Sequence, residues 1–540
     1  MAAFLYWPLR NGHAYLDDFL FLALARHIDD PLWLLTRDST GLFFFRPVGM
    51  FVSWLTVGAF GERAPLHIAF NVALHASNGV LLHAVSRRMG IATWPAAIVA
   101  VLFVAHPAAF AASAWIADRF DLLALAFSLL SMLATLRLRS RFSAGNALLV
   151  AAALLAAMLS KESGFAAPVA CALLFCLPGA DGSRVERRAL AAAFAFIAVL
   201  TLAALAWRSI AIRGVGDVMF FKDGVAAAFT GGFWRWLTLL PPFFFVNFGN
   251  PAAVIAWAIG LLAALALLIP RAARSALRRA PAWQVILLGV VFATLTALAQ
   301  APVVKATRVA LFVQDGLAFD AIGGCRFFYL PLAGLALAFT AIAQAIGAAS
   351  TSRRFHAGVA VLAGVMLAAS IVSARAIGRE WAAFPLANGE RELQLMTQVT
   401  RGLTDATPGC KIYFLDVPAR AEPALGLLDV GVKKSLPREH PAAACFISSE
   451  HTPWYHMVPE RLGAGAGAPL STMVFAGKPF APLRVANLAL HYLDAADAKA
   501  IAADPAARFF TYRDGAFAEV TEAVRSGSLK PRFHVNRVAF

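Results

Sequence analysis

The stretch LHIAFNVALHASNGVLLHAV, residues 66–85, carries the pattern that decides the fold, a long apolar run with a few polar side chains at helical spacing. Four of these polar residues follow one another at intervals of four, four and three positions: His67, Asn71, His75 and Asn78. Such intervals place them on one side of a helix. A run of this length crosses roughly 30 Å of hydrocarbon, where polar groups face protein or water. The stripe therefore predicts either hydrogen bonds between helices or the wall of a groove for a lipid phosphate.

The rest of the chain is similarly apolar. Of its 540 residues, 60% are hydrophobic and 14% are charged, and the mean hydropathy is +0.69, whereas soluble proteins carry roughly 25% charged residues. Further membrane-spanning helices are expected at 92–106, 121–138, 144–160, 163–178, 189–207, 251–270, 281–302, 327–348 and 356–376. The sequence predicts a mainly α fold, a polytopic transmembrane bundle of about 10–11 spans, with a C-terminal soluble α/β domain.

The net charge of +16 comes from arginines in short loops and does not indicate a nucleic-acid-binding face. The basic loops fall in every second connection: Arg87-Arg88, Arg137/Arg139/Arg141, Arg184/Arg187/Arg188, Arg271/Arg274/Arg278/Arg279 and Arg353-Arg354. The positive-inside rule assigns these loops to the cytoplasm. The alternate connections then share the opposite, extracytoplasmic side: 106–121, 160–162, 208–250 and 305–326. We expect an integral protein of the bacterial inner membrane.

Three regions are predicted along the chain. Residues 1–65 form an outer-face segment with interfacial helices, 66–379 the transmembrane domain, and 380–540 a soluble extracytoplasmic α/β domain. Strand-like runs mark the last region, at 411–415, 444–447 and 472–475, and a hairpin is predicted between 509–512 and 517–520. Cys410 and Cys445 are placed to form a disulfide there if their separation permits one. The topology also leads us to expect an additional helix before Asp17.

Two adjacent carboxylates, Asp17 and Asp18, lie in the stretch Tyr15–Leu20. A membrane protein avoids such a pair unless it does chemistry or lies outside the hydrocarbon. Arg46-Pro47 interrupts the next apolar run, 42–60, which favours an interfacial helix over a spanning one. The acidic pair is therefore either a solvated turn between surface helices or a catalytic group at the membrane surface.

The connection from His106 to Asp121 gathers an imidazole, two carboxylates and a guanidinium. Arg119 suits a phosphate, because its planar fork donates two parallel hydrogen bonds. Asp118 and Asp121 are candidate ligands for a divalent cation, Mg²⁺ or Mn²⁺. Alternatively, these residues form an ion-pair cluster that caps the following helix.

The connection Ser160-Lys161-Glu162 interrupts an apolar hairpin on the same side. Lys161 and Glu162 either mark the turn as a charged pair or act on the substrate, Lys161 by neutralising a phosphate leaving group.

The order of these motifs resembles the membrane domain of the transmembrane, tetratricopeptide-containing O-mannosyltransferases and their bacterial relatives, which are GT-C glycosyltransferases. The resemblance covers roughly residues 14–335 and rests on six motifs: Asp17-Asp18, Phe45-Arg46-Pro47, the stripe at 67–78, the segment from His106-Pro107 to Leu123, Ser160-Lys161-Glu162 and Arg326-Phe327-Phe328-Tyr329-Leu330-Pro331. It implies a polyprenyl-phosphate sugar donor, transfer on the extracytoplasmic face and a catalytic base at Asp17 or Asp18. Residues expected to bind the donor phosphate or substrate are Arg46, His106, Arg119, Asp121, Lys161, Glu162 and Arg326.

The chain departs from this family in three ways. The relatives often have a Glu shortly after His106-Pro107, whereas residues 108–112 here are Ala-Ala-Phe-Ala-Ala. Cys325 stands where an acidic residue is usual before Arg326, and the α/β tail replaces the tetratricopeptide repeats. The acceptor is therefore left open between protein, lipid and glycan. Two other functions stay in view, a transporter or flippase of a lipid-linked substrate, and a membrane-anchored partner-binding protein.

Overall fold

The computed structural model describes residues 2–12, 18, 21–22, 25, 28, 30–36, 45–61, 63–179, 183–211, 282–304, 325–348, 352–402, 411–415, 446–449, 456–459, 473–475, 478–480, 484–485, 488–491, 503–513 and 516–529. The chain divides into two compact units. The first comprises Met1–Gly12 and Arg63–Ala383, and the second comprises His13–Glu62 and Phe384–Phe540.

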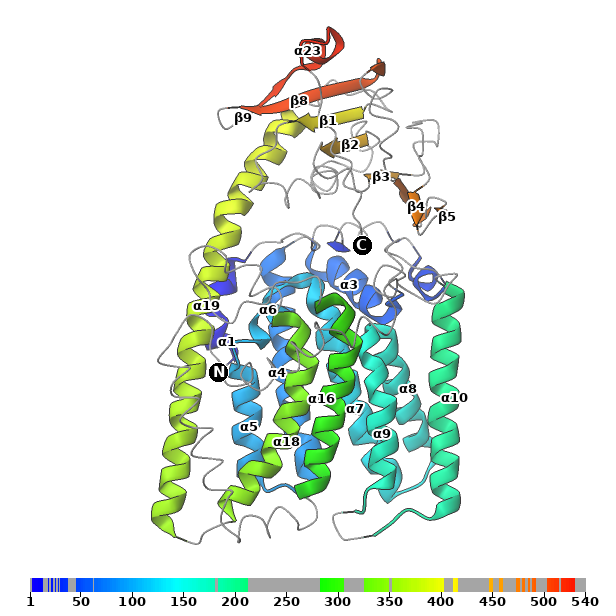
Figure 1. Cartoon of the computed structure of the whole chain (residues 1–540), viewed down its shortest axis with the longest axis vertical. Helices are drawn as coiled ribbons and strands as arrows, with labels where there is room; N and C mark the ends of the chain where they lie inside the picture. Colours follow the sequence, from blue (N-terminus) through cyan, green and yellow to red (C-terminus); the bar gives the residue numbers. More distant parts are fainter. Residues whose placement is uncertain are drawn as a thin grey trace. The chain divides into compact units, whose positions relative to one another are not determined.

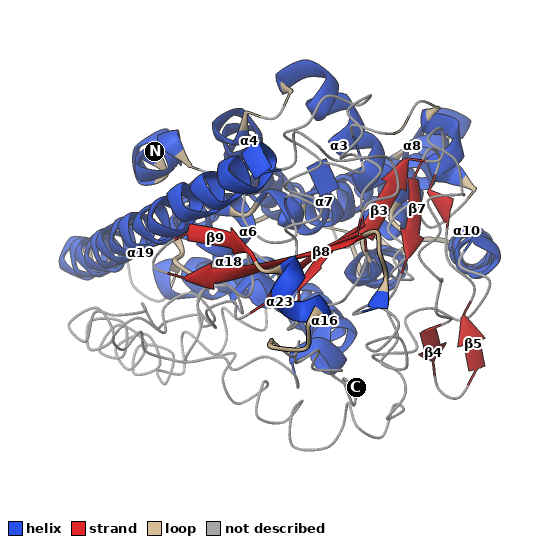
Figure 2. Ribbon diagram, turned by 90° about the horizontal axis from the view of Figure 1, so that it is seen from above, coloured by secondary structure: helices blue, strands red, loops and turns tan. Residues whose placement is uncertain are grey.

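The first unit is a bundle of helices, most of them roughly parallel to one another (Figure 1). In chain order they are α1 (Ala2–Leu5), η1 (Trp7–Asn11), α4 (Ala64–Arg88), α5 (Thr93–Ala105), α6 (Ala109–Ala114), η3 (Ile116–Asp118), α7 (Arg119–Ser140), α8 (Ala144–Ser160), η4 (Glu162–Phe165), α9 (Ala166–Cys176), α10 (Arg187–Ala211), α16 (Ala282–Val304), η5 (Cys325–Phe328), α18 (Tyr329–Gly347) and α19 (Arg353–Gly402), which continues into the second unit. Figure 2 gives the view from above, in which α10 is seen nearly end-on.

Among the described residues, six helices are long and apolar enough to cross a membrane: Ala64–Arg88, Ile116–Ser140, Arg187–Ala211, Ala282–Gln300, Arg326–Ala345 and Arg353–Arg379. A seventh span is formed if α5 and the segment Pro107–Ala114, bent by 55° relative to it, cross together. Shorter apolar helices cover Ala144–Ser160 and Glu162–Cys176. The predicted mainly α membrane bundle is confirmed. The expected span at 251–270 lies outside the described residues.

From α4 to α10, the described turns between consecutive helices alternate between the two ends of the bundle (Figure 1). At one end, Arg139 near the end of α7 donates to the carbonyls of Leu174 in α9 and Ser183 in the next connection. At that same end, the Gln344 side chain of α18 accepts from the Ala92 amide, in the turn between α4 and α5. The basic loops around residues 88, 140 and 184 therefore gather at one end, as a chain running back and forth requires.

Helices α16 and α18 approach each other unusually closely. A Cβ atom on Gly334 of α18 would lie 2.6 Å from the Ala293 nitrogen and 2.7 Å from the Gly289 carbonyl of α16. Only the absence of a side chain permits this backbone contact, which is typical of small residues where membrane helices pack. The close packing fixes α18, which begins at the site described below.

The second unit contains η2 (Pro31–Leu35), α3 (Pro47–Phe60) and a small amount of sheet. Helix α3 begins with Pro47, where the missing N–H costs no helical bond. Its 14 residues are fewer than a span needs, consistent with the interfacial helix expected there. Trp54 anchors it by donating to the Ile28 carbonyl over 3.0 Å.

The strands of the second unit are β1 (Lys411–Leu415), β2 (Phe446–Ser449), β3 (His456–Pro459), β4 (Met473–Phe475), β5 (Lys478–Phe480), β6 (Arg484–Val485), β7 (Leu488–His491), β8 (Ala507–Arg513) and β9 (Ala516–Glu519). Four of them form a sheet in the order β2-β1-β8-β9, in which β1 pairs in parallel with both β2 and β8. The predicted strands near 411, 446 and 473 are present. The predicted hairpin is the antiparallel pair β8 and β9, which lie side by side in both views (Figures 1 and 2).

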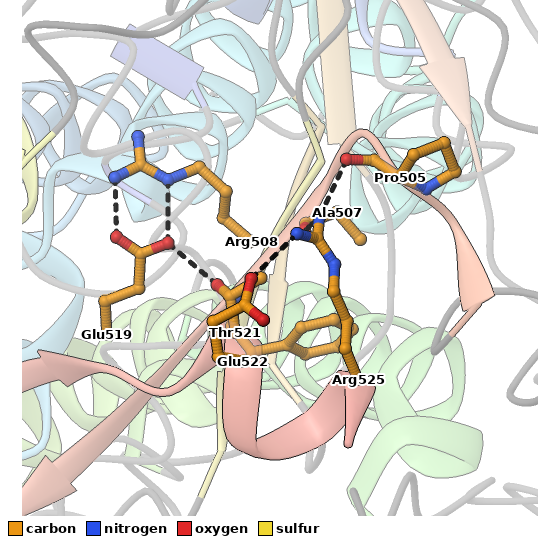
Figure 3. Close-up of polar contacts among 8 residues, drawn as sticks. Pro505, Ala507, Arg508, Glu519, Thr521, Glu522 and Arg525 are labelled. Carbon is orange, nitrogen blue, oxygen red and sulfur yellow. Dashed lines mark hydrogen bonds and ion pairs between the residues drawn. The ribbon is translucent and has the colours of Figure 1, made fainter. Parts of the chain in front are cut away.

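A polar network holds β8, β9 and the short helix α23 (Thr521–Arg525) together (Figure 3). Arg508 donates two hydrogen bonds to Glu519, at 3.1 and 2.7 Å. These bonds hold the pKa of the Glu519 carboxyl below its ordinary value. Thr521 donates to Glu519, and Arg525 reaches back to the Pro505 carbonyl. The network stabilises the hairpin, and nothing in it points to a ligand.

Candidate functional site

The polar stripe of α4 consists of His67, Asn71, His75 and Asn78, and all four side chains are completely buried. Their hydrogen bonds join α4 to other segments of the bundle. The structural interpretation of the stripe, hydrogen bonding between helices, is therefore confirmed. Its two halves have different partners. The first half contacts the start of α7, and the second half contacts α18.

The first half of the stripe holds Arg119. The Arg119 Nε donates to the Asn71 side chain at 3.0 Å, and a terminal nitrogen lies 3.2 Å from His67 Nδ1. Asn71 in turn donates to the Trp115 carbonyl at 2.9 Å. The guanidinium carbon also lies 5.1 Å from the centre of the Phe70 ring. Arg119 is 1% exposed and joins α4 to the start of α7; this position makes it a structural element of the site.

The second half of the stripe holds the start of α18. His75 Nδ1 lies 2.8 Å from the Tyr329 hydroxyl, and its Nε2 lies 3.2 Å from the Val104 carbonyl. Asn78 donates to the Tyr329 oxygen and to the Leu122 carbonyl, both at 3.0 Å. Four helices, α4, α5, α7 and α18, are therefore joined by one set of buried polar contacts.

His106 lies at the bend between α5 and α6 and is 2% exposed. Its Nδ1 accepts a hydrogen bond from the Ala108 amide at 3.1 Å, so the ring satisfies the first backbone amide after Pro107. All six residues of α6, Ala109–Ala114, are buried. Small alanine side chains let this short helix pack within the bundle, which is a physical reason for the alanine-rich sequence of this segment.

Three ion pairs join the ends of different helices at the end of the first unit where α7 and α18 begin. Lys161, after α8, pairs with Asp121 in the first turn of α7. Glu162, in η4, pairs with Arg208 in the last turn of α10 at 2.9 Å. Arg326, in η5, has its Nε 3.8 Å from an Asp118 oxygen. The predicted connections around residues 106–121, 160–162, 208 and 326 thus converge.

The contacts of Asp118, Lys161 and Glu162 distinguish between their alternative roles. Asp118 occupies the position before α7, but its side chain makes no capping hydrogen bond. Lys161 and Glu162 each pair with a residue on another helix, so they do more than mark a turn. Gly164 makes this geometry possible, because a Cβ there would collide with the Ala157 carbonyl at the end of α8.

Arg326 differs from the other basic residues of the cluster. Its guanidinium carbon lies 4.0 Å from the centre of the Trp115 ring and 4.9 Å from that of Phe327. Among the described residues its ion-pair partner is Asp118, at a distance longer than a hydrogen bond, and its side chain is 20% exposed. Aromatic faces therefore hold the cation in place, and within the described part of the chain its donor groups are not taken up by another hydrogen bond.

The remaining predicted site residues are Asp17, Asp18 and Arg46. Asp17 is outside the described residues. Asp18 and Arg46 belong to the second unit, where Asp18 is buried and Arg46 precedes α3. For the candidate cation ligands Asp118 and Asp121, the described part of the chain contains no group of three or more His, Cys, Asp or Glu side chains arranged to hold a metal ion.

Sequence reasoning missed several members of the cluster. The sequence predicts Arg208 to lie in a connection, whereas the structure shows it as the ion-pair partner of Glu162. Tyr329 and Trp115 were included in motifs without a role of their own, and their contacts to His75 and Arg326 emerge only in the fold. A charged residue in the last turn of a spanning helix was the available signal for Arg208.

Comparisons with known proteins do not assign the chain to a family. No protein-family model matches the chain, and no curated protein matches it. Among solved structures, the chain is similar to the archaeal oligosaccharyltransferase AglB from Archaeoglobus fulgidus, solved in complex with an inhibitory peptide and a dolichol-phosphate. The identity is 12% and the TM-score 0.38, with 78% of this chain and 60% of that chain covered. The chain thus spans less than two thirds of the length of that enzyme.

Proposed function

We propose that this protein is a membrane glycosyltransferase of the GT-C type, which transfers a sugar from a polyprenyl-phosphate donor to an acceptor hydroxyl on the extracytoplasmic face. The observation that supports it best is the charged cluster at one end of the membrane helices. Three basic side chains pair with three carboxylates there, Lys161 with Asp121, Arg208 with Glu162 and Arg326 with Asp118. Arg119, held by Asn71, adds a fourth positive charge at the start of α7. Charges buried in a membrane protein mark functional sites by default, because burying them is costly.

Within this proposal, Arg326 is the first contact of the donor phosphate. A guanidinium fork matches a phosphate in a bidentate geometry that a lysine does not reproduce. Arg119 and Lys161 already donate to Asn71 and Asp121. They supply positive potential around the leaving group, and Arg326 supplies the hydrogen bonds. A cationic site with little water stabilises the charge that develops on the departing phosphate.

The reaction is a single displacement. The acceptor oxygen forms a bond to the sugar C1 atom as the bond from C1 to the phosphate oxygen breaks, and that electron pair leaves with the polyprenyl phosphate. The hydroxyl proton passes to Asp17 or Asp18, the base that the family resemblance implies. Such a base contributes roughly 10²–10⁴-fold, and one displacement inverts the anomeric centre.

The test is sugar transfer in membrane fractions containing the full chain, with a radiolabelled polyprenyl-phosphate mannose as the probe. We expect wild type to label protein, lipid or glycan. Asp17→Asn or Asp18→Asn should reduce labelling by roughly 10²-fold or more. The matched control is Asp30→Asn, an exposed carboxylate that accepts only from the nearby Leu32 amide among the contacts of the described chain; it should label normally.

Equal labelling by wild type, Asp17→Asn and Asp18→Asn would remove the proposed base. Absence of labelling with wild type, together with energy-dependent movement of the same lipid, would favour a flippase instead. Repeating the assay with and without Mg²⁺ or Mn²⁺ tests whether Asp118 and Asp121 hold a cation during transfer.

A further inference from the structure

We propose that Tyr329 is a positioning residue for the donor phosphate, because its hydrogen bonds to His75 and Asn78 fix the start of α18 and thereby the place of Arg326. The inference rests on the proposed function and extends it to a residue that contacts no substrate. It concerns how the phosphate-binding cation is held, which neither the motifs nor the resemblance address.

The direction of every hydrogen bond in this network can be assigned. The Val104 carbonyl only accepts, so His75 Nε2 carries a proton and donates to it. In a neutral ring, Nδ1 is then an acceptor, and the Tyr329 hydroxyl must donate to it. The Tyr329 oxygen is left free to accept from the Asn78 amide. The donors therefore run from Asn78 through Tyr329 and His75 to the Val104 carbonyl. In this arrangement every hydrogen bond has one donor and one acceptor.

The network is rigid as well as consistent. Tyr329 is fully buried, and its ring centre lies 5.5 Å from that of His75 and 5.6 Å from that of Phe103. His75 is packed in turn against Tyr6, at 5.9 Å. A phenol held by two hydrogen bonds and two rings has one orientation, so the backbone at Tyr329 is fixed relative to α4 and α5.

This anchor is directly connected to the phosphate-binding residue. The short helix η5, Cys325–Phe328, carries Arg326 and runs into α18 at Tyr329 without a break. Phe327 of the same turn is one of the two rings beneath the Arg326 guanidinium. Rotation of α18 about its axis would therefore move both the Arg326 guanidinium and the Phe327 ring. The hydrogen bonds of the Tyr329 hydroxyl to α4 oppose that rotation.

A purely structural role would also explain a buried tyrosine, and a double-mutant cycle separates the two. The full chain is purified into nanodiscs, and the dissociation constant for ³²P-labelled polyprenyl phosphate is measured. The variants are Tyr329→Phe, Arg326→Ala and the double variant. The control is Thr340→Val, which removes another fully buried hydroxyl of α18 whose bond, to the Leu337 carbonyl, stays within the helix.

We expect Tyr329→Phe to weaken binding by about tenfold, the size of coupling through a packed network. In the Arg326→Ala background the same change should alter binding by less than about twofold, because the residue through which it acts is gone. Thr340→Val should bind as wild type does. Asn78→Ala removes the donor to the Tyr329 oxygen and replaces Tyr329→Phe in the cycle if that variant does not fold.

Wild-type affinity in Tyr329→Phe, or an equal loss in both backgrounds, would overturn the positioning role while leaving the proposed function intact. Failure of the wild type itself to bind polyprenyl phosphate saturably would contradict the proposed function, and this inference would fall with it.

Discussion

At the scale of single residues, the buried pair of Lys161 and Asp121 shows why buried charges in this protein form ion pairs. Asp121 is fully buried and Lys161 nearly so. Each charge alone would lose several kcal/mol of hydration on leaving water. Their mutual attraction offsets this loss, and it also joins the end of α8 to the start of α7.

Breaking this pair should therefore be costly, whereas replacing it entirely should not. We expect Lys161→Met to destabilise the full chain by about 3–5 kcal/mol, because it leaves the Asp121 carboxylate buried without its partner. The double variant Lys161→Met with Asp121→Leu should recover most of that loss while remaining inactive in sugar transfer. The measurement is the apparent melting temperature in detergent, followed by size-exclusion chromatography after heating.

The control for this prediction is Glu522→Gln, which breaks the exposed pair with Arg525 in the second unit and should leave the melting temperature unchanged. A double variant no more stable than Lys161→Met would show that the pair contributes more than charge compensation.

At the scale of elements, the contact between α16 and α18 determines where the arginine-bearing turn lies. Gly334 of α18 faces Gly289 and Ala293 of α16 at backbone distance. Membrane helices gain stability from such close contact through van der Waals packing. Because α18 begins directly after Arg326, separation of the two helices would also disturb the cluster.

We expect Gly334→Ala to destabilise the protein by about 1–3 kcal/mol, since its Cβ would lie 2.6 Å from a backbone nitrogen and the helices must move apart. The comparison is Gly364→Ala on α19, where a Cβ meets no atom within 4 Å and alanine improves helix propensity. Melting temperatures of the two variants test this. Equal behaviour would mean that α16 and α18 are not in contact.

The sequence was most informative about the positions of the helices. Apolar runs of spanning length, such as 66–85 and 121–138, correspond to α4 and α7 because the hydrocarbon thickness fixes helix length. The 3.6-residue period placed His67 to Asn78 on one face correctly. What it did not reveal was the partner of each residue, such as Tyr329 for His75 or Arg208 for Glu162, since partners come from segments brought together only by packing.

At the scale of the whole molecule, the alternation of basic and mixed-charge connections is the feature on which the proposed function depends. In the first unit, the basic connections around residues 88, 140 and 184 lie at one end of the helices and the charged cluster lies at the other (Figure 1). From the positive-inside rule we expect the cluster to be extracytoplasmic, on the side where the proposed donor and acceptor would be used. A cluster on the cytoplasmic side would not fit this reaction.

The most direct test of this account is the sidedness of the two ends. In a chain whose five native cysteines are replaced by alanine, single cysteines are placed at Ile210, 76% exposed beside Arg208, and at Phe142, 53% exposed in a basic loop. A membrane-impermeant maleimide is then added to intact spheroplasts. We predict labelling of Ile210→Cys in intact cells and of Phe142→Cys only after lysis. The opposite result would place the charged cluster in the cytoplasm and contradict the proposed function.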